Sequence, residues 1–332
     1  MTTTKPSVPL VTAPAAAGAI AKTATTSTSS TSSKKTAGRV RRPFSLGRTL
    51  GWIVLIVSLV LTIFPFYWML KTALTPAADV IRDSGSLFPG SPTIINFARV
   101  LGFLTPAQDQ AAGGSGASIN FLLYLWNSII YCALIGFFQT LFCAMGGYAF
   151  ARLRFPGRNI LFAILIAALM VPGIFTLLPN FVLVRDLGLL NNVFGMVAPS
   201  LLMTPFALFF LRQFFLNIPV DVEEAALLDG AGKARVFWRI ALPMSKGPLI
   251  TIGLITVVWA WKDYLWPLLI GRDESVRTMT VALGVYLQQS PNTQPDWTGL
   301  MAGSTLSVIP VLVLLIFLGR RIVESLNFTG IK

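Results

Sequence analysis

Six apolar stretches, each long enough to cross a membrane, constrain this chain more than any other feature of its sequence. Five of them carry no charged residue: Thr49–Leu70, Phe121–Ala151, Asn159–Val184, residues 187–211 and Thr298–Gly319. The sixth, Gly247–Ile270, is charged only at Lys262 and Asp263. A helix of about 20 apolar residues spans the ~30 Å hydrocarbon core of a bilayer. The sequence therefore predicts an all-α integral membrane protein with six transmembrane helices.

The basic residues predict the orientation of these helices. The chain has 26 Lys and Arg residues against 13 Asp and Glu, a net charge of +13. If the N-terminus is cytoplasmic, 19 of the 26 basic residues lie in cytoplasmic segments and six lie in outer loops. The remaining one, Lys262, lies within the sixth apolar stretch. This asymmetry is the positive-inside pattern. We therefore expect both termini to be cytoplasmic. The excess positive charge is a signal of this topology, so the partner it implies is membrane lipid and no nucleic acid is needed to explain it.

The chain is expected to have two parts. Residues 1–45 are mostly Ala, Thr, Ser, Pro and Lys, which cannot bury enough apolar surface to fold, and they predict a disordered cytoplasmic tail. Residues 46–332 form the six-helix domain, with a long outer loop at about 72–120 and a long cytoplasmic loop at about 212–246. The Gly/Ala/Ser-rich part of the outer loop, Ala111–Ala117, is predicted to be flexible.

Several kinds of chemistry are excluded by composition. The chain has no histidine, which removes His-based acid/base catalysis, His metal ligands and Ser-His or Cys-His nucleophile pairs. Its two cysteines, Cys132 and Cys143, are eleven residues apart on one predicted helix, roughly 16 Å, so they cannot form a disulfide. We do not expect an enzyme.

Three prolines, Pro172, Pro179 and Pro205, are predicted to kink their helices.

The cytoplasmic loop has the pattern of two short helices. Asp221 stands three residues ahead of Glu224 and after Pro219, which predicts an acidic capping box that opens the first helix. Gly230 can take the positive φ that ends it. A second helix is expected from Lys233 to about Ile240, closed by Pro243. Such a helix pair can dock into another protein or lie on the inner leaflet, and the pattern alone leaves both open.

A resemblance distinguishes the two alternatives. Glu224-Ala225-Ala226, three residues, Gly230, nine residues, Ile240, one residue and Leu242-Pro243 match the EAA loop of permease subunits of ABC importers at every fixed position. Further blocks resemble the maltose-permease-like carbohydrate branch: Phe66–Leu70, Phe88-Pro89, Asn127-Ser128, Gly147–Arg152, Met170–Pro172, Leu187–Asn191, Pro310-Val311 and Thr329–Lys332.

The resemblance implies an ABC importer permease fold in a bacterial inner membrane. It implies an assembly with a second permease subunit, two ATPase subunits and an extracytoplasmic solute-binding protein, which together import a sugar-like solute. The residues it places at the ATPase are Glu223, Glu224, Ala225, Ala226, Asp229, Gly230, Ile240, Leu242 and Pro243.

The ATP-binding motif is expected in another chain. The string closest to a P-loop, Gly230–Ala234, has Leu227 where the first glycine belongs and Ala234 where the Mg²⁺-binding hydroxyl belongs. No cofactor is therefore expected here, and ATP and Mg²⁺ would be bound by the partner ATPase. The rival interpretation is a secondary transporter or channel that works without an ATPase.

Lys262 and Asp263 are the candidate residues of a solute path, because charges within a membrane span often mark one. In the family this segment reads Trp-Asn-Glu/Gln, so lysine here replaces asparagine. Aromatic residues surround Lys262, and an interfacial anchoring role is favoured for it over a role in the path. For Asp263 both interpretations stay open.

Overall fold

The computed structural model describes residues 46–116, 119–288 and 295–327, and within these ranges the chain is all-helical with no β-strand. The predicted tail, residues 1–45, lies outside the described residues. The chain divides into two structural units, Met1–Leu55 and Ile56–Lys332. The helical core and the candidate sites belong to the second unit.

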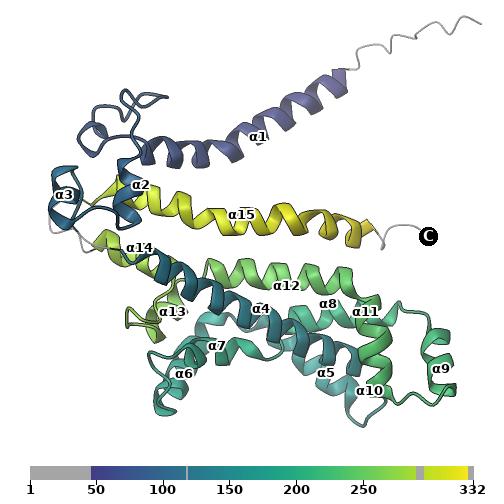
Figure 1. Ribbon diagram of the computed structural model, residues 1–332. Coiled ribbons are helices and arrows are strands. Elements are labelled where there is room, and N and C mark those ends of the chain that lie inside the picture. Colours follow the sequence, from purple (N-terminus) through teal and green to yellow (C-terminus); the bar gives the residue numbers. More distant parts are fainter. Residues whose placement is uncertain (1–45, 117–118, 289–294, 328–332) are drawn as a thin grey trace, which may run out of the picture. The chain divides into compact units, whose positions relative to one another are not determined.

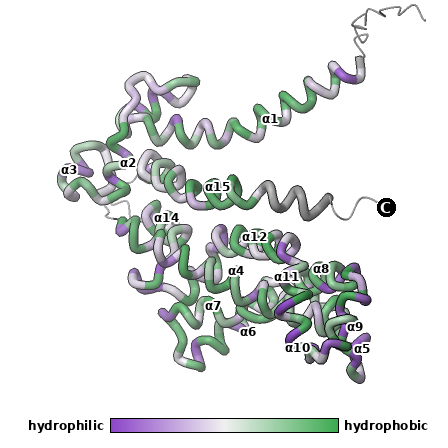
Figure 2. The backbone as a smooth tube through the Cα atoms, turned by 45° about the vertical axis from the view of Figure 1, so that its right-hand side comes forward, coloured by the Kyte–Doolittle hydropathy of each residue, from purple (hydrophilic) through white to green (hydrophobic). Residues whose placement is uncertain are grey.

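Three of the predicted spans are single long helices: α1 (Leu46–Ala73), α4 (Phe121–Arg152) and α15 (Trp297–Asn327). Each contains an apolar segment long enough to cross a membrane. Apolar side chains along α1 are exposed, from Trp52 through Phe66. In Figure 2 the long helices are predominantly hydrophobic, while hydrophilic residues gather around α9 and α10. Lipid is the expected cover for such apolar surfaces.

The other three predicted spans are not single straight helices. Three bent pairs of helices take their place. The first joins α5 (Arg158–Ala167) and a short 3₁₀ turn to α6 (Gly173–Asp186) with a bend of 102°, and the second joins α7 (Val193–Leu201) to α8 (Pro205–Leu216) with a bend of 48°. The third joins the helical segment Lys233–Met244 to α12 (Lys246–Trp261) with a bend of 78°. After a break, α12 is followed by the short helix α13 (Leu265–Ile270). Counting each bent pair as one span gives up to six spans.

Two of the predicted proline kinks explain the bends. Pro172 is the N-cap residue of α6, and Pro205 is the first residue of α8. Proline lacks the N–H of an interior helix bond and clashes with the preceding turn, so each marks a point where a helix stops and a new one starts. Pro179, in contrast, lies inside α6 without interrupting it.

Helix α4 is the central element of the core and packs against α7, α8 and α12 (Figure 1). Glycines permit this close packing. A Cβ at Gly136 would lie 2.5 Å from Cγ2 of Val257 on α12, and a Cβ at Gly147 would lie 3.0 Å from the backbone N of Arg212 on α8. Small residues at such contacts let helix backbones approach closely in membranes.

The loop at about 72–120, which is predicted to lie outside and is called the outer loop below, is partly helical. It contains α2 (Ile95–Val100) and α3 (Pro106–Ala111), and a buried arginine holds it. Arg99 on α2 pairs with Asp109 on α3 at 2.5 Å and with Asp296 just before α15. Burial alone would lower the pKa of Arg99, but the two carboxylates outweigh burial and raise it above its ordinary value. Arg99 therefore connects the loop to α15 as a fully charged group.

The Gly/Ala/Ser-rich part of this loop was predicted to be flexible, but where the structure describes it, up to Gly116, it is held in place. The backbone N–H of Gly116 donates to Asp109 at 2.6 Å. A Cβ at Gly114 would lie 2.2 Å from Arg99 Nη2 and 2.4 Å from the Asp109 carboxylate. Glycine is needed here because the chain passes directly over the Arg99–Asp109 ion pair.

Candidate functional site

The loop predicted to be cytoplasmic, at about 212–246, folds into a short helix, a turn at glycine and a second helix, as expected. The first helix is α9 (Val220–Leu228). The second is α10 (Lys233–Val236), which continues through a π turn, Phe237–Ala241, into α11 (Leu242–Met244). Gly230 between them has φ of 79°, the left-handed conformation expected of a glycine that ends a helix.

Two details of the prediction were wrong. Asp221 does not cap α9: the N-cap residue is Pro219, which makes no side-chain cap hydrogen bond, and Asp221 and Glu223 lie in the first turn. There their charge favours the positive end of the helix dipole instead. Pro243 does not close the second helix, because it falls in the first turn of α11, where a residue without an N–H is tolerated. The bend of 78° toward α12 follows at Ser245.

The residues of the EAA pattern point in two directions. Glu224, Ala225, Asp229 and Gly230 are exposed, and Leu228 is 88% exposed. We call these five residues the docking face. Positions 224, 225, 228 and 229 lie on one side of a helix, since residues three and four apart are neighbours. A leucine and an alanine exposed between two carboxylates form a surface that another protein can cover.

Glu223 faces the opposite way and is buried, with 7% of its surface exposed. Its Oε1 forms an ion pair with Nε of Arg152, the last residue of α4, at 3.1 Å. The hydroxyl of Tyr148, one turn earlier on α4, donates to Glu223 Oε2 at 3.3 Å. Arg152 also donates to the carbonyl of Ile218, just before α9. Glu223 is therefore the residue that fastens α9 to the central helix.

Aromatic packing extends this attachment to the second helix. The ring of Tyr148 lies edge-on to Phe215 of α8, with centroids 5.6 Å apart, and 5.1 Å from Phe237 of the π turn. Together with Ile218 and Ala241 these rings belong to one buried cluster. Among the remaining predicted coupling residues, Leu242 is half-buried against this cluster, Ala226 and Ile240 are half-buried, and Pro243 is exposed.

Sequence reasoning missed Tyr148 and Arg152 as functional candidates. Both were noted only as part of the block Gly147–Arg152 that resembles the family. One signal could have pointed to them, namely that two adjacent acidic residues on a short helix cannot both face the same way. The inward one then needs a cationic partner, since a buried charge is costly without one.

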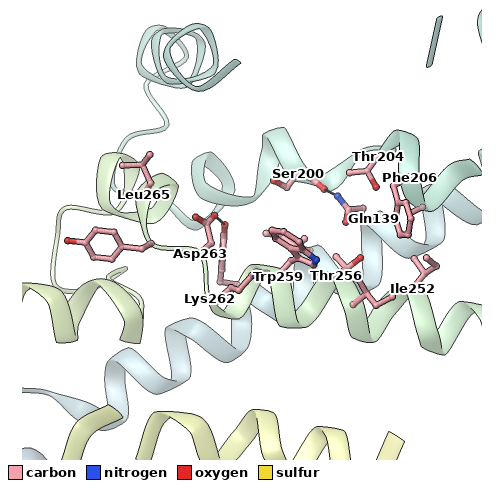
Figure 3. A pocket seen from close by; sticks show the side chains of 16 residues that line it. Gln139, Ser200, Thr204, Phe206, Ile252, Thr256, Trp259, Lys262, Asp263 and Leu265 are labelled. Atoms are coloured by element: carbon pink, nitrogen blue, oxygen red, sulfur yellow. Dashed lines mark hydrogen bonds between the residues drawn. The ribbon is translucent and has the colours of Figure 1, made fainter. Parts of the chain in front are cut away.

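A second candidate region is a pocket of about 870 Å³ bordered by α4, the α7–α8 junction and the α12–α13 break. Tyr131, Ile135 and Gln139 line it at four-residue intervals along α4. Figure 3 shows Gln139 and Ser200 on one side of the space and Trp259 and Thr256 of α12 on the other. Gln139 Nε2 donates to the carbonyl of Ser200 at 2.8 Å, which joins α4 to α7 beside the pocket.

Both candidate path residues, Lys262 and Asp263, line this pocket where the backbone leaves the helix. The sequence predicted that both residues lie on a continuous helix. In the structure α12 ends at Trp261, so they lie just after it instead. Asp263 accepts a hydrogen bond from the Tyr131 hydroxyl at 3.1 Å. The Lys262 amine lies 3.7 Å from the ring centroid of Trp259. Irregular backbone at membrane depth is tolerated where it lines a cavity, which fits this arrangement.

Neither region resembles a metal site. Within the described ranges, no three His, Cys, Asp or Glu side chains are grouped so that they could hold an ion. Cys132 and Cys143 both lie on α4, where they are free and buried. The two regions are an exposed helix face on α9 and a pocket lined by apolar and hydrogen-bonding side chains.

Comparisons with known proteins agree with this description. The sn-glycerol-3-phosphate transport system permease protein UgpE of Yersinia pestis bv. Antiqua is 31% identical over 274 residues, which cover 82% of this chain and 94% of that protein. The probable ABC transporter permease protein YurM of Bacillus subtilis is 29% identical over 293 residues, covering 88% of this chain and 91% of that protein. In fold, the chain matches a bacterial ABC transporter involved in the import of the acidic polysaccharide alginate, with a TM-score of 0.69 and 23% identity over 83% of this chain and 98% of the other.

Residues 136–327, which contain the Glu223 attachment, the docking face and most of the residues that line the pocket, match the family described as the inner membrane component of binding-protein-dependent transport systems. This match covers more than half of the chain, and the relatives match nearly their whole length. The resemblance inferred from the EAA pattern is thereby confirmed. This chain belongs to the binding-protein-dependent transport family, as a permease subunit of an ABC importer whose ATPase is a separate subunit.

Proposed function

We propose that this chain forms half of the transmembrane pathway of an importer for a sugar or sugar-like solute. Its partners are a second, different permease subunit, two ATPase subunits and an extracytoplasmic solute-binding protein. Relatives named for sn-glycerol 3-phosphate transport and the fold match to an alginate importer support a polyhydroxylated cargo. The chain performs no covalent chemistry, and ATP and Mg²⁺ are bound by the ATPase subunits.

The observation that carries the proposal is the division of α9 into two faces. Glu223 is tied to Arg152 at the end of α4, while Leu228 and the rest of the docking face are exposed. A protein that covers the docking face and moves therefore pulls on α4 through a buried ion pair. Because α4 packs against α7, α8 and α12, this movement reaches the pocket. Alternating access follows when the closing ATPase dimer drives the movement.

The proposal includes an orientation and a path. The docking face, the N-terminus and the C-terminus lie on the cytoplasmic side of the membrane. The outer loop, which is held by Arg99, lies on the side of the binding protein. The pocket at the α12–α13 break forms this chain's part of the solute path, since it combines apolar walls with hydrogen-bonding side chains.

Cysteine crosslinking in the assembled importer tests the docking role. Cys132 and Cys143 are buried, so the wild-type chain serves as the background. Leu228→Cys is expected to crosslink to the ATPase and to react with a membrane-impermeant maleimide only from the cytoplasmic side. Ser84→Cys, at an exposed position in the outer loop, is the matched control and is expected to react only from outside.

Three results would contradict the proposal. Labelling of Leu228→Cys from outside would reverse the orientation. Crosslinks from Leu228→Cys to lipid alone would remove the docking role, as would uptake that proceeds without the ATPase subunits.

A further inference from the structure

We infer that the solute carried past this pocket is anionic, with a phosphate or carboxylate group that binds Lys262. The inference rests on the proposed function and narrows its cargo to one charge class. It comes from the balance of charge on the pocket wall. The wall contains one lysine and one aspartate, Lys262 and Asp263, which stand next to each other in the chain.

Asp263 is already engaged by the protein. Its carboxylate accepts from the Tyr131 hydroxyl at 3.1 Å, and the backbone groups of Tyr264 and Trp266 also hydrogen-bond to it. It is half-buried, in the turn that joins α12 to α13. These donors hold the negative charge at the helix break, so its role is to shape this part of the pocket.

Lys262 is engaged differently. In the part of the chain that the structure describes, no carboxylate lies within ion-pair distance of its amine. Its contact is the face of Trp259, with the amine 3.7 Å from the ring centroid. A cation–π contact stabilises an ammonium group but leaves its N–H donors largely unused. The pocket therefore presents a positive charge whose hydrogen-bonding capacity is available to a ligand.

The position of Trp259 keeps that charge at the pocket. Lys262 and Trp259 both line the pocket, and Trp259 lies on α12 about one helical turn before Lys262. An anchoring lysine would extend along the helix toward lipid headgroups. Here the amine folds back over a pocket-lining ring, which favours a ligand in the pocket over a lipid as its partner.

The rest of the wall suits the polyhydroxylated part of such a solute. Thr256 and Ser200 supply hydroxyl groups on opposite sides, and Gln139 keeps its side-chain oxygen as an acceptor after its amide donates to Ser200. Tyr131 and Trp259 add aromatic surface. Hydroxyl groups of the solute can exchange hydrogen bonds along this wall while the anionic group is held at Lys262.

The test compares anionic solutes with related neutral solutes in the complete importer, reconstituted in vesicles with its second permease, ATPase and binding protein. The probes are sn-glycerol 3-phosphate against glycerol, and digalacturonate against maltose. Lys262→Met removes the charge but keeps an apolar stem, and Lys262→Arg keeps the charge. Because the binding protein is the same throughout, a change in the ratio of anionic to neutral uptake isolates the permease.

In the supporting result, the wild type takes up an anionic probe, and Lys262→Met lowers the anionic-to-neutral uptake ratio by roughly 10-fold or more, the size expected for a lost charge-assisted hydrogen bond. Lys262→Arg is expected to retain most of the wild-type ratio. Vesicles of neutral lipid and vesicles with added anionic lipid are compared, and the supporting result is the same loss in both.

Three results would overturn the inference. The first is a wild-type importer that takes up only neutral probes. The second is an unchanged ratio in Lys262→Met. The third is a loss that depends on anionic lipid rather than on solute charge, which would make Lys262 a headgroup anchor. Failure of the wild type to import any of the four probes would instead refute the proposed sugar-like cargo, and the inference would fall with it.

Discussion

Arg152 and Glu223 form a buried ion pair, 3.1 Å from Nε to Oε1, that joins the end of the central helix α4 to the helix that carries the docking face. Glu223 and Glu224 are neighbours in sequence with opposite roles. One is buried within the chain and the other is exposed. In the proposed mechanism the pair transmits the movement of a docked ATPase to the membrane helices.

Breaking this pair is expected to uncouple the importer. Glu223→Gln or Arg152→Gln leaves its partner charge buried and unpaired, which costs about 3–5 kcal/mol of folding free energy. The docking face remains, so the ATPase is expected to stay bound while solute uptake per ATP hydrolysed falls at least several-fold. The measurements are ATPase co-purification, thermal unfolding and uptake in reconstituted vesicles.

This experiment has two matched controls, a double variant that reverses the two charges and a substitution of a nearby exposed arginine. The double variant Arg152→Glu with Glu223→Arg restores the ion pair, and we expect it to recover part of the lost coupling. Arg154→Gln changes an exposed arginine two residues away and is expected to shift the free energy of unfolding by about 0.5 kcal/mol or less. Equal effects of Arg152→Gln and Arg154→Gln would contradict the assigned role.

Gly230 gives a second prediction, because its φ of 79° is unfavourable for a residue with a Cβ. No atom lies within 4 Å of a Cβ built there, so conformation rather than space decides the effect. Gly230→Val is expected to cost roughly 1–2 kcal/mol and to displace the exposed turn, which weakens ATPase binding. Gly230→Asn is expected to bind more nearly as the wild type does, since asparagine tolerates this conformation better. Both are measured by ATPase co-purification, and equal binding by the two variants would remove the conformational argument.

The membrane helices could be predicted from sequence to the extent that local hydropathy determines them. The six apolar stretches were located correctly, and Pro172 and Pro205 marked two of the bends. Hydropathy measures how apolar a segment is and contains no information about its direction. The break at Lys262, which brings α12 and α13 around the pocket, was therefore missed.

The site shows the same division between local and distant information. The positive φ of Gly230 follows from one residue and its spacing, and it was predicted. The inward position of Glu223 depends on Tyr148, which is 75 residues away in the chain. No spacing rule connects them, because they meet only after α8 has packed against α4. The sequence thus located the two short helices but could not say which of the two glutamates is exposed.

The outer loop offers a third prediction. Arg99→Met leaves the carboxylates of Asp109 and Asp296 buried without their cation, and the expected loss is about 3–5 kcal/mol of folding free energy. Arg82→Met, at an exposed position of the same loop, is the control and is expected to change it by about 0.5 kcal/mol or less. Gly114→Ala perturbs the same ion pair by steric contact and is expected to act like Arg99→Met. Thermal unfolding of the purified importer measures all three variants. Equal melting temperatures for Arg99→Met and Arg82→Met would show that the ion pairs of Arg99 do not hold the loop in place.

Tyr286 on α14 (Met279–Gln288) makes the stability of this cluster depend on pH in a defined direction. Its hydroxyl donates to Asp296 at 2.6 Å, and burial together with that carboxylate raises its pKa well above the usual range. In the unfolded chain Tyr286 loses its proton near pH 10, whereas in the folded chain it still keeps its proton at that pH. The stability that Tyr286 supplies is therefore complete below about pH 10 and declines as the pH rises above it. Tyr286→Phe has no such group, so the wild type is expected to exceed it in melting temperature by a margin that is constant from about pH 8 to about pH 9 and shrinks toward about pH 11. A margin that stays constant over the whole range would show that Tyr286 and Asp296 do not interact in this way.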